Sequence, residues 1–126
     1  MRTNILVIAA LAGCAAPATL QQPRPSVAAG MTAGETRSCI STSASESLTI
    51  IDDGVVGYRS GRITWLNRLP ARCAGLHPLN TLVVEAQGSQ ICRGDRIRVI
   101  QHPLTIPGPT CILGNFQAYR SDPLIL

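Results

Sequence analysis

Residues 55–66 read Val55-Val56-Gly57-Tyr58-Arg59-Ser60-Gly61-Arg62-Ile63-Thr64-Trp65-Leu66, and this stretch decides the fold. Two runs rich in β-forming residues, 55–59 and 62–66, flank Ser60-Gly61, which is typical of a two-residue hairpin loop. The cross-strand pairs expected from that loop are Arg59–Arg62, Tyr58–Ile63, Gly57–Thr64 and Val56–Trp65. Because alternate pairs point to opposite sides of a sheet, the stretch predicts a hairpin with one apolar face, made of Val56, Tyr58, Ile63 and Trp65.

Further strands are predicted on both sides of this hairpin. Residues 47–53 are rich in β-branched side chains and run into an Asp-Asp-Gly turn, and residues 81–86, 96–100 and 115–119 are also strand-like. Residues 67–80 are expected to form a long loop. Residues 103–111, which contain three prolines, are expected to form an irregular arm. No segment has helical periodicity over three turns. The fold class is therefore mainly β, a small antiparallel sheet or half-open barrel of five or six strands in one domain, residues 37–120.

Four of the five cysteines fall within this domain: Cys39, Cys73, Cys92 and Cys111. Only four aromatic residues are available to the core, and a small domain with so little to bury gains from covalent constraints. An even cysteine set indicates two disulfides if the chain is exported, as its N-terminal residues, described next, predict. Four cysteines allow three pairings. We favour Cys39–Cys111, which would tie the domain ends together, and Cys73–Cys92, which would clamp the long loop.

The first fourteen residues are typical of a bacterial lipoprotein signal. Arg2 precedes the apolar run 5–12, and Leu11-Ala12-Gly13-Cys14 has the form of a lipobox. Eight apolar residues are too few to cross a bilayer, which takes about 20 in a helix. We therefore predict removal of residues 1–13 and attachment of diacylglyceryl and palmitate to Cys14. The alternative is a plain secretory signal, cut at an Ala-x-Ala-like site within 15–18.

The segment that follows Cys14 is predicted to tether the domain to the membrane. Residues 14–36 contain mainly small and polar residues, which cannot bury enough surface to fold. A flexible coil of this length reaches on the order of 25 Å. Ala15, rather than Asp, follows the cysteine, which by resemblance to enterobacterial lipoprotein sorting favours the outer membrane. We expect a lipid-anchored protein of the bacterial cell envelope that faces the periplasm, with 121–126 as a C-terminal tail.

The charge pattern argues against nucleic acid as a partner. All eleven basic residues are arginine, the formal net charge is +4, and the charges are scattered along the chain. Arg59 opposite Arg62, joined by Arg96 and Arg98, is instead a candidate anion-binding group, because like charges placed face to face favour an anionic partner. Lipid headgroups, lipopolysaccharide phosphate and peptidoglycan carboxylates would fit. In the alternative interpretation these arginines are solvated or paired with Glu46, Glu85 or Asp95.

The sequence offers no motif for catalysis, a metal or a cofactor. His77 and His102 each precede a proline and lie 25 residues apart, so a shared metal is not expected. Neither Cys-x-x-Cys nor Gly-x-Ser-x-Gly occurs. Asp52-Asp53 precedes a glycine and is more simply a turn than an acid–base pair. Arg93-Gly94-Asp95 is also expected to be a turn, in which Asp95 caps or pairs.

Several stretches of the chain resemble an uncharacterised family of small exported proteins of sphingomonads and related proteobacteria, many of them lipoproteins. The resemblance covers residues 37–119, and Leu-Pro-x-x-Cys-x-Gly-Leu and Cys-x-Leu-Gly-x-Phe are its more specific parts. The stretches concerned are Arg37-Ser38-Cys39-Ile40, Ile51-Asp52-Asp53, Ser60-Gly61-Arg62, Leu69-Pro70-Ala71-Arg72-Cys73-Ala74-Gly75-Leu76, Ile91-Cys92 with Asp95 and Ile97, and Cys111-Ile112-Leu113-Gly114-Asn115-Phe116. The resemblance implies a domain of unknown function without catalytic residues to transfer.

These observations together predict a non-enzymatic envelope lipoprotein that acts as an interaction or structural module. Its expected partners are the membrane, through the lipid on Cys14, and an envelope protein or anionic envelope polymer. The alternative from another class is a small periplasmic hydrolase or an inhibitor of one. An enzyme should show a concave pocket with convergent polar groups, whereas a module should show a flat or edge-strand surface.

Overall fold

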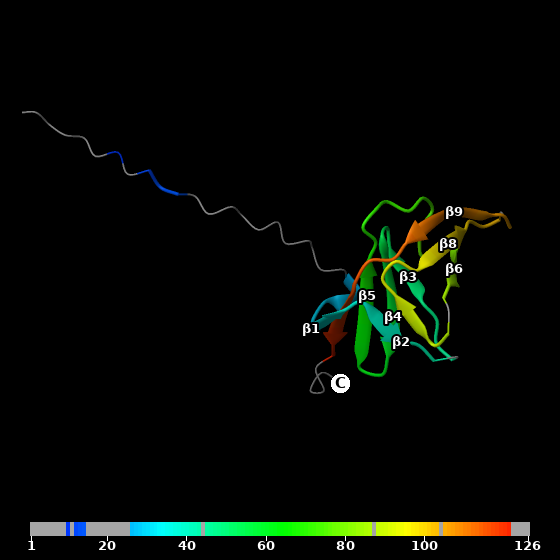
Figure 1. Ribbon diagram of the computed structural model, residues 1–126, viewed down its shortest axis with the longest axis horizontal. Helices are drawn as coiled ribbons and strands as arrows, with labels where there is room; N and C mark the ends of the chain where they lie inside the picture. Colours follow the sequence, from blue (N-terminus) through cyan, green and yellow to red (C-terminus); the bar gives the residue numbers. More distant parts are fainter. Residues whose placement is uncertain are drawn as a thin grey trace, which may run out of the picture.

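The computed structural model describes residues 10, 12–14, 26–43, 45–86, 88–103 and 105–121 (Figure 1). Most of the predicted signal peptide, the tether up to residue 25 and the tail residues 122–126 lie outside the described residues. The fold class is confirmed as mainly β. The described strands number ten, which exceeds the predicted five or six, and they form antiparallel sheets rather than a closed barrel.

The strands of the described part form three antiparallel sheets, which we call A, B and C. Sheet A has the order β1-β10-β5-β4-β3, sheet B pairs β2 with β7, and sheet C has the order β6-β8-β9. In Figure 1, β1 lies at one side of the molecule and sheet C at the other, with β4 and β5 between them. The elements are the 3-10 helix η1 (Ser26–Ala28) and the strands β1 (Thr32–Arg37), β2 (Cys39–Ser41), β3 (Thr49–Asp52), β4 (Val55–Ser60), β5 (Ile63–Arg68), β6 (Thr81–Glu85), β7 (Gln90–Cys92), β8 (Arg96–Ile100), β9 (Pro107–Ile112) and β10 (Phe116–Arg120).

One main core joins the three sheets. Tyr58, Trp65 and Phe116 enter it from sheet A, with exposed fractions of 2%, 6% and 0%. Sheet B contributes Ile40 and Ile91, and sheet C contributes Ile97 and Val99. A smaller cluster lies on the other face of sheet A, where Ala28 of η1 packs with Val55 and Leu66. Sheet A is therefore buried on both faces around its central strands, β4 and β5.

The predicted register of the β4–β5 hairpin is wrong: each residue of β4 pairs with the residue two positions further along β5 than expected. The structure pairs Ser60 with Ile63 and Tyr58 with Trp65, so the loop is Gly61-Arg62 rather than Ser60-Gly61. Gly61 has a φ of 59°, which a glycine adopts without the steric cost a Cβ would bring, and a glycine at the first loop position is typical of a type II′ turn. A slip of two residues between strands leaves every side chain on its own face. The predicted apolar face is therefore confirmed, although its pairs are not.

The folded domain begins earlier than predicted. Strand β1, assigned to the tether by the sequence except for Arg37, pairs with β10 at the edge of sheet A. All six of its residues are exposed, so the strand has no hydrophobic periodicity to reveal it. Side-chain contacts hold it instead: Gln117 Nε2 donates to Gly34 O at 2.6 Å, and the Arg37 guanidinium lies 5.3 Å from the Trp65 ring centroid.

The expected disulfide pairing is also wrong. The structure joins Cys39 to Cys92 and Cys73 to Cys111. The first bond follows from two short strands that the sequence did not predict, because β2 and β7 place Cys39 and Cys92 directly opposite each other. The second follows from the proline-containing arm, which forms the edge strand β9 and brings Cys111 to the loop after β5. An edge strand tolerates proline because it has a side without ladder hydrogen bonds.

Candidate functional site

Cys14 is set apart from the other cysteines. All five cysteines are described, four form the two disulfides, and Cys14 is exposed with a free thiol. The lipobox prediction places the attachment of lipid at this thiol. A search of the described residues finds no helix with the length and apolar character to cross a membrane.

The four candidate anion-binding arginines form two separate pairs. Arg59 lies opposite Thr64 rather than Arg62, and its Nε donates to Gly61 O at 3.4 Å. Arg62 lies in the hairpin loop of sheet A. Arg96 and Arg98 lie on β8, in sheet C. The predicted face-to-face pair is therefore absent, and the hairpin pair does not share a sheet with the β8 pair.

Arg96 and Arg98 lie on the outer face of sheet C, which we define by Val83, Glu85, Arg96, Arg98, Thr110 and Ile112. Two cross-strand rows make up this face, Val83–Arg98–Thr110 and Glu85–Arg96–Ile112. The opposite face carries Leu82, Val84, Ile97, Val99 and Cys111, which belong to or pack against the main core. The strict alternation of β8, predicted from the sequence, thus separates core from surface.

The outer face of sheet C mixes aliphatic and charged groups. Val83 and Ile112 keep 38% and 44% of their surface exposed. Arg98 Nε lies 3.1 Å from Glu85 Oε1, which is an ion pair, while that nitrogen is shielded from solvent and makes no hydrogen bond. This pairing with Glu85 is the one anticipated in the alternative interpretation of the arginines. Two arginines against one glutamate leave the face with a surplus of one positive charge.

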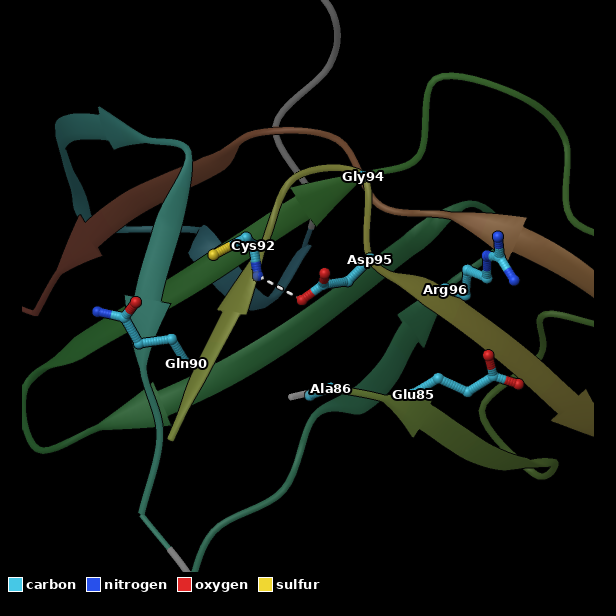
Figure 2. A pocket seen from close by; sticks show the side chains of 7 residues that line it. All are labelled: Glu85, Ala86, Gln90, Cys92, Gly94, Asp95 and Arg96. Atoms are coloured by element: carbon cyan, nitrogen blue, oxygen red, sulfur yellow. Dashed lines mark hydrogen bonds between the residues drawn. The ribbon is translucent and has the colours of Figure 1, made fainter. Parts of the chain in front are cut away.

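A polar hollow of about 630 Å³ adjoins this face (Figure 2). Figure 2 shows Glu85 and Arg96 together on β6 and β8, with Gln90 on β7 at the other side. The hollow thus lies where the chain leaves sheet C for sheet B and returns. Its lining is Glu85, Ala86, Gln90, Cys92, Gly94, Asp95 and Arg96.

The Asp95 carboxylate in this hollow holds a turn together. Cys92 N–H donates to Asp95 Oδ2 at 2.8 Å, and the Asp95 backbone N–H donates to Cys92 O at 3.0 Å. Gly94 has a φ of 90°, which suits the turn. The structure therefore confirms Arg93-Gly94-Asp95 as a capped turn, as expected from the sequence.

The contact between His77 and Asp53 was not predicted from the sequence. His77, in the predicted loop 67–80, and Asp53, in the predicted Asp-Asp-Gly turn, meet with Nδ1 2.6 Å from Oδ1. They are 24 residues apart, and only the packing of the loop after β5 against the β3–β4 turn brings them together. His102 lies elsewhere, with Nε2 2.9 Å from Thr81 Oγ1. Among the described residues, no group of three or more His, Cys, Asp or Glu side chains could hold a metal ion.

Comparisons with protein-family models, with curated proteins and with solved structures find no match for this chain. We therefore argue its function from its own residues and their geometry.

Proposed function

We propose that the protein is a lipid-anchored, non-enzymatic interaction module of the bacterial cell envelope. The observation that carries this proposal is that four cysteines are paired in disulfides and Cys14 is not. The two disulfides use all four domain cysteines and leave over the one cysteine that ends Leu11-Ala12-Gly13-Cys14. Two structural disulfides are typical of an oxidising compartment. The fifth cysteine then needs a separate role, and lipid attachment at the end of Leu11-Ala12-Gly13-Cys14 supplies one.

The outer face of sheet C supports the interaction role. Exposed aliphatic side chains beside arginines suit a partner that offers an anionic group next to an apolar surface. The Glu85–Arg98 ion pair leaves Arg96, an exposed residue, as the guanidinium best placed to meet such an anion. An envelope protein or an anionic envelope polymer has this chemistry, and the lipid on Cys14 would hold the face within reach of it.

The anchor is tested by growth of an expressing Gram-negative host with an alkyne analogue of palmitate. We expect the unaltered protein to take up the label and to fractionate with membranes. The Cys14→Ser variant should take up none and leave the membrane fraction, because the hydroxyl cannot form the thioether. Equal labelling of the variant, or an unlabelled wild-type protein in the soluble periplasmic extract, would contradict the anchor.

The interaction face is tested with two matched double variants. Arg96→Gln/Arg98→Gln should weaken cosedimentation with anionic vesicles or cell-wall sacculi by about fivefold per arginine that contacts the anion, because each guanidinium near such a surface is worth about 1 kcal/mol. Arg59→Gln/Arg62→Gln removes the same charge from the hairpin tip and should change binding little. Equal losses in both variants would show general charge attraction and remove the face from the proposal.

A further inference from the structure

A second hollow, of about 540 Å³, lies between the β3–β4 turn and the loop that follows β5. We call it the loop hollow. Asp53 and Gly54 line it on the turn side, and residues 68–77 line it on the loop side. Its volume is within the range of about 300–1,000 Å³ that is usual for small-molecule sites. It shares no lining residue with the hollow beside sheet C.

The walls of the loop hollow are fixed by several bonds. Leu69 N–H donates to Gly54 O at 2.9 Å and joins the loop to the turn. Asn80 Nδ2 donates to Gly75 O at 2.7 Å, and the Cys73–Cys111 disulfide ties the loop to β9. A site whose walls are held before a ligand arrives loses less entropy on binding. The loop hollow is thus preorganised although it is built from a long connection.

The His77–Asp53 contact gives the loop hollow an oriented imidazole. An ionised carboxylate only accepts hydrogen bonds, so Nδ1 carries the proton that lies between Nδ1 and Oδ1. The other nitrogen, Nε2, has no hydrogen-bond partner among the described residues. When the imidazole is protonated, Nε2–H is a donor for an anion. His77 is therefore held at the rim of the hollow with one nitrogen available to a ligand.

Arg72 offers an exposed guanidinium to a ligand in the hollow. It lies on the loop side of the lining, four residues after Arg68. Arg72 is exposed, and a guanidinium binds phosphate or carboxylate through two parallel hydrogen bonds. The lining also has apolar side chains: Leu69 and Leu76 are buried, whereas Pro70, Ala71 and Ala74 are exposed. These residues can cover the body of a small organic molecule whose charged head meets Arg72 and His77.

We propose that the loop hollow is a binding site for a small organic oxyanion, with Arg72 and His77 as the recognition residues. The charged head is a phosphate or carboxylate group, and the apolar lining receives the attached hydrocarbon. The lining contains no hydroxyl side chain, and its one cysteine, Cys73, is in a disulfide. The site is therefore one for binding rather than for covalent catalysis. It does not depend on the anchor or on the outer face of sheet C.

The proposal is tested by NMR titration of the full-length oxidised chain in a neutral detergent, with phenyl phosphate, benzoate and inorganic phosphate as separate probes. We expect saturable shifts of the amides of residues 72–77 in the millimolar range with at least one of the two organic probes. Arg72→Gln and His77→Gln should each weaken binding by about tenfold, the size of one charge-assisted hydrogen bond. Arg93→Gln, which removes an exposed charge from the turn after β7, should leave binding unchanged.

Each outcome decides a separate part of the proposal. Tighter binding of phenyl phosphate than of benzoate assigns a phosphate head, and the reverse order assigns a carboxylate. Equal binding of inorganic phosphate and phenyl phosphate supports the anion site but removes the role of the apolar lining. Absence of saturable shifts, or unchanged binding in both folded variants, overturns the proposal. Unchanged thermal unfolding of the variants shows that they remain folded.

Discussion

Asn67 is fully buried and joins two parts of the chain that are 47 residues apart. Its Nδ2 donates to Gly114 O at 2.7 Å, and Gly114 N–H donates back to its Oδ1 at 2.8 Å. Gly114 has no room for a side chain, because an added Cβ would lie 2.7 Å from Arg68 O. The Asn67 amide thus forms hydrogen bonds with both backbone polar groups of Gly114. At this position the backbone lies too close to β5 for any residue other than glycine.

Replacement of Asn67 by alanine should lower the free energy of unfolding by about 3 kcal/mol. The change leaves the N–H and C=O of Gly114 buried without partners, and each such group costs about 1–3 kcal/mol. Urea denaturation monitored by tryptophan fluorescence measures the loss. Asn115→Ala, at an exposed neighbouring position, is the matched control and should cost less than about 0.5 kcal/mol. Similar losses in the two variants would refute the role of the Asn67 amide.

At the level of single residues, the sequence indicated the sites whose signal is local. Asp95 is one of these, because its turn involves near neighbours. The lipid site proposed at Cys14 also rests on a local signal, a run of four adjacent residues. The His77–Asp53 contact has no local signal, since it depends on how the long loop packs against the β3–β4 turn. The same reason applies to Asn67, whose partner Gly114 is distant in the sequence.

Among the strands, those long enough to show an alternating buried face were predicted, and those that are fully exposed, very short or interrupted by proline were not. Residues 96–100 alternate apolar and charged side chains, and β8 has those bounds. Strand β1 is exposed throughout, β2 and β7 have three residues each, and β9 contains Pro107 and Pro109. Hydrophobic periodicity cannot reveal such strands. Because these strands position Cys39, Cys92 and Cys111, their omission also made the disulfide pairing wrong.

Peptide mapping without reduction tests the disulfide pairing of these strands. Trypsin alone cannot resolve it, because no arginine lies between Cys73 and Cys92. A second protease that cuts after Glu46 and Glu85 separates all four cysteines onto different peptides. We expect one linked pair that contains Cys39 and Cys92 and another that contains Cys73 and Cys111. A peptide that links Cys39 to Cys111 would contradict the arrangement of β2, β7 and β9.

At the scale of the domain, the three sheets of the described residues share one core, and two disulfides connect distant parts of the chain. The bonds span 53 and 38 residues, and loop closure of that size stabilises a fold by about 4 kcal/mol per bond in the chain-entropy model. A domain with four aromatic residues gains much of its net stability in this way. Such a domain needs an oxidising compartment, which is consistent with the proposed export.

The central claim is that this domain is held at a membrane by lipid on Cys14, and the mass of the mature N-terminal peptide tests it most directly. The protein is extracted from membranes of an expressing Gram-negative host, digested and analysed by mass spectrometry. We predict a peptide that begins at Cys14, lacks residues 1–13 and carries the mass of a diacylglyceryl group with a further fatty acyl chain. An unmodified N-terminus within residues 15–19, produced by an ordinary secretory cleavage, would contradict the claim.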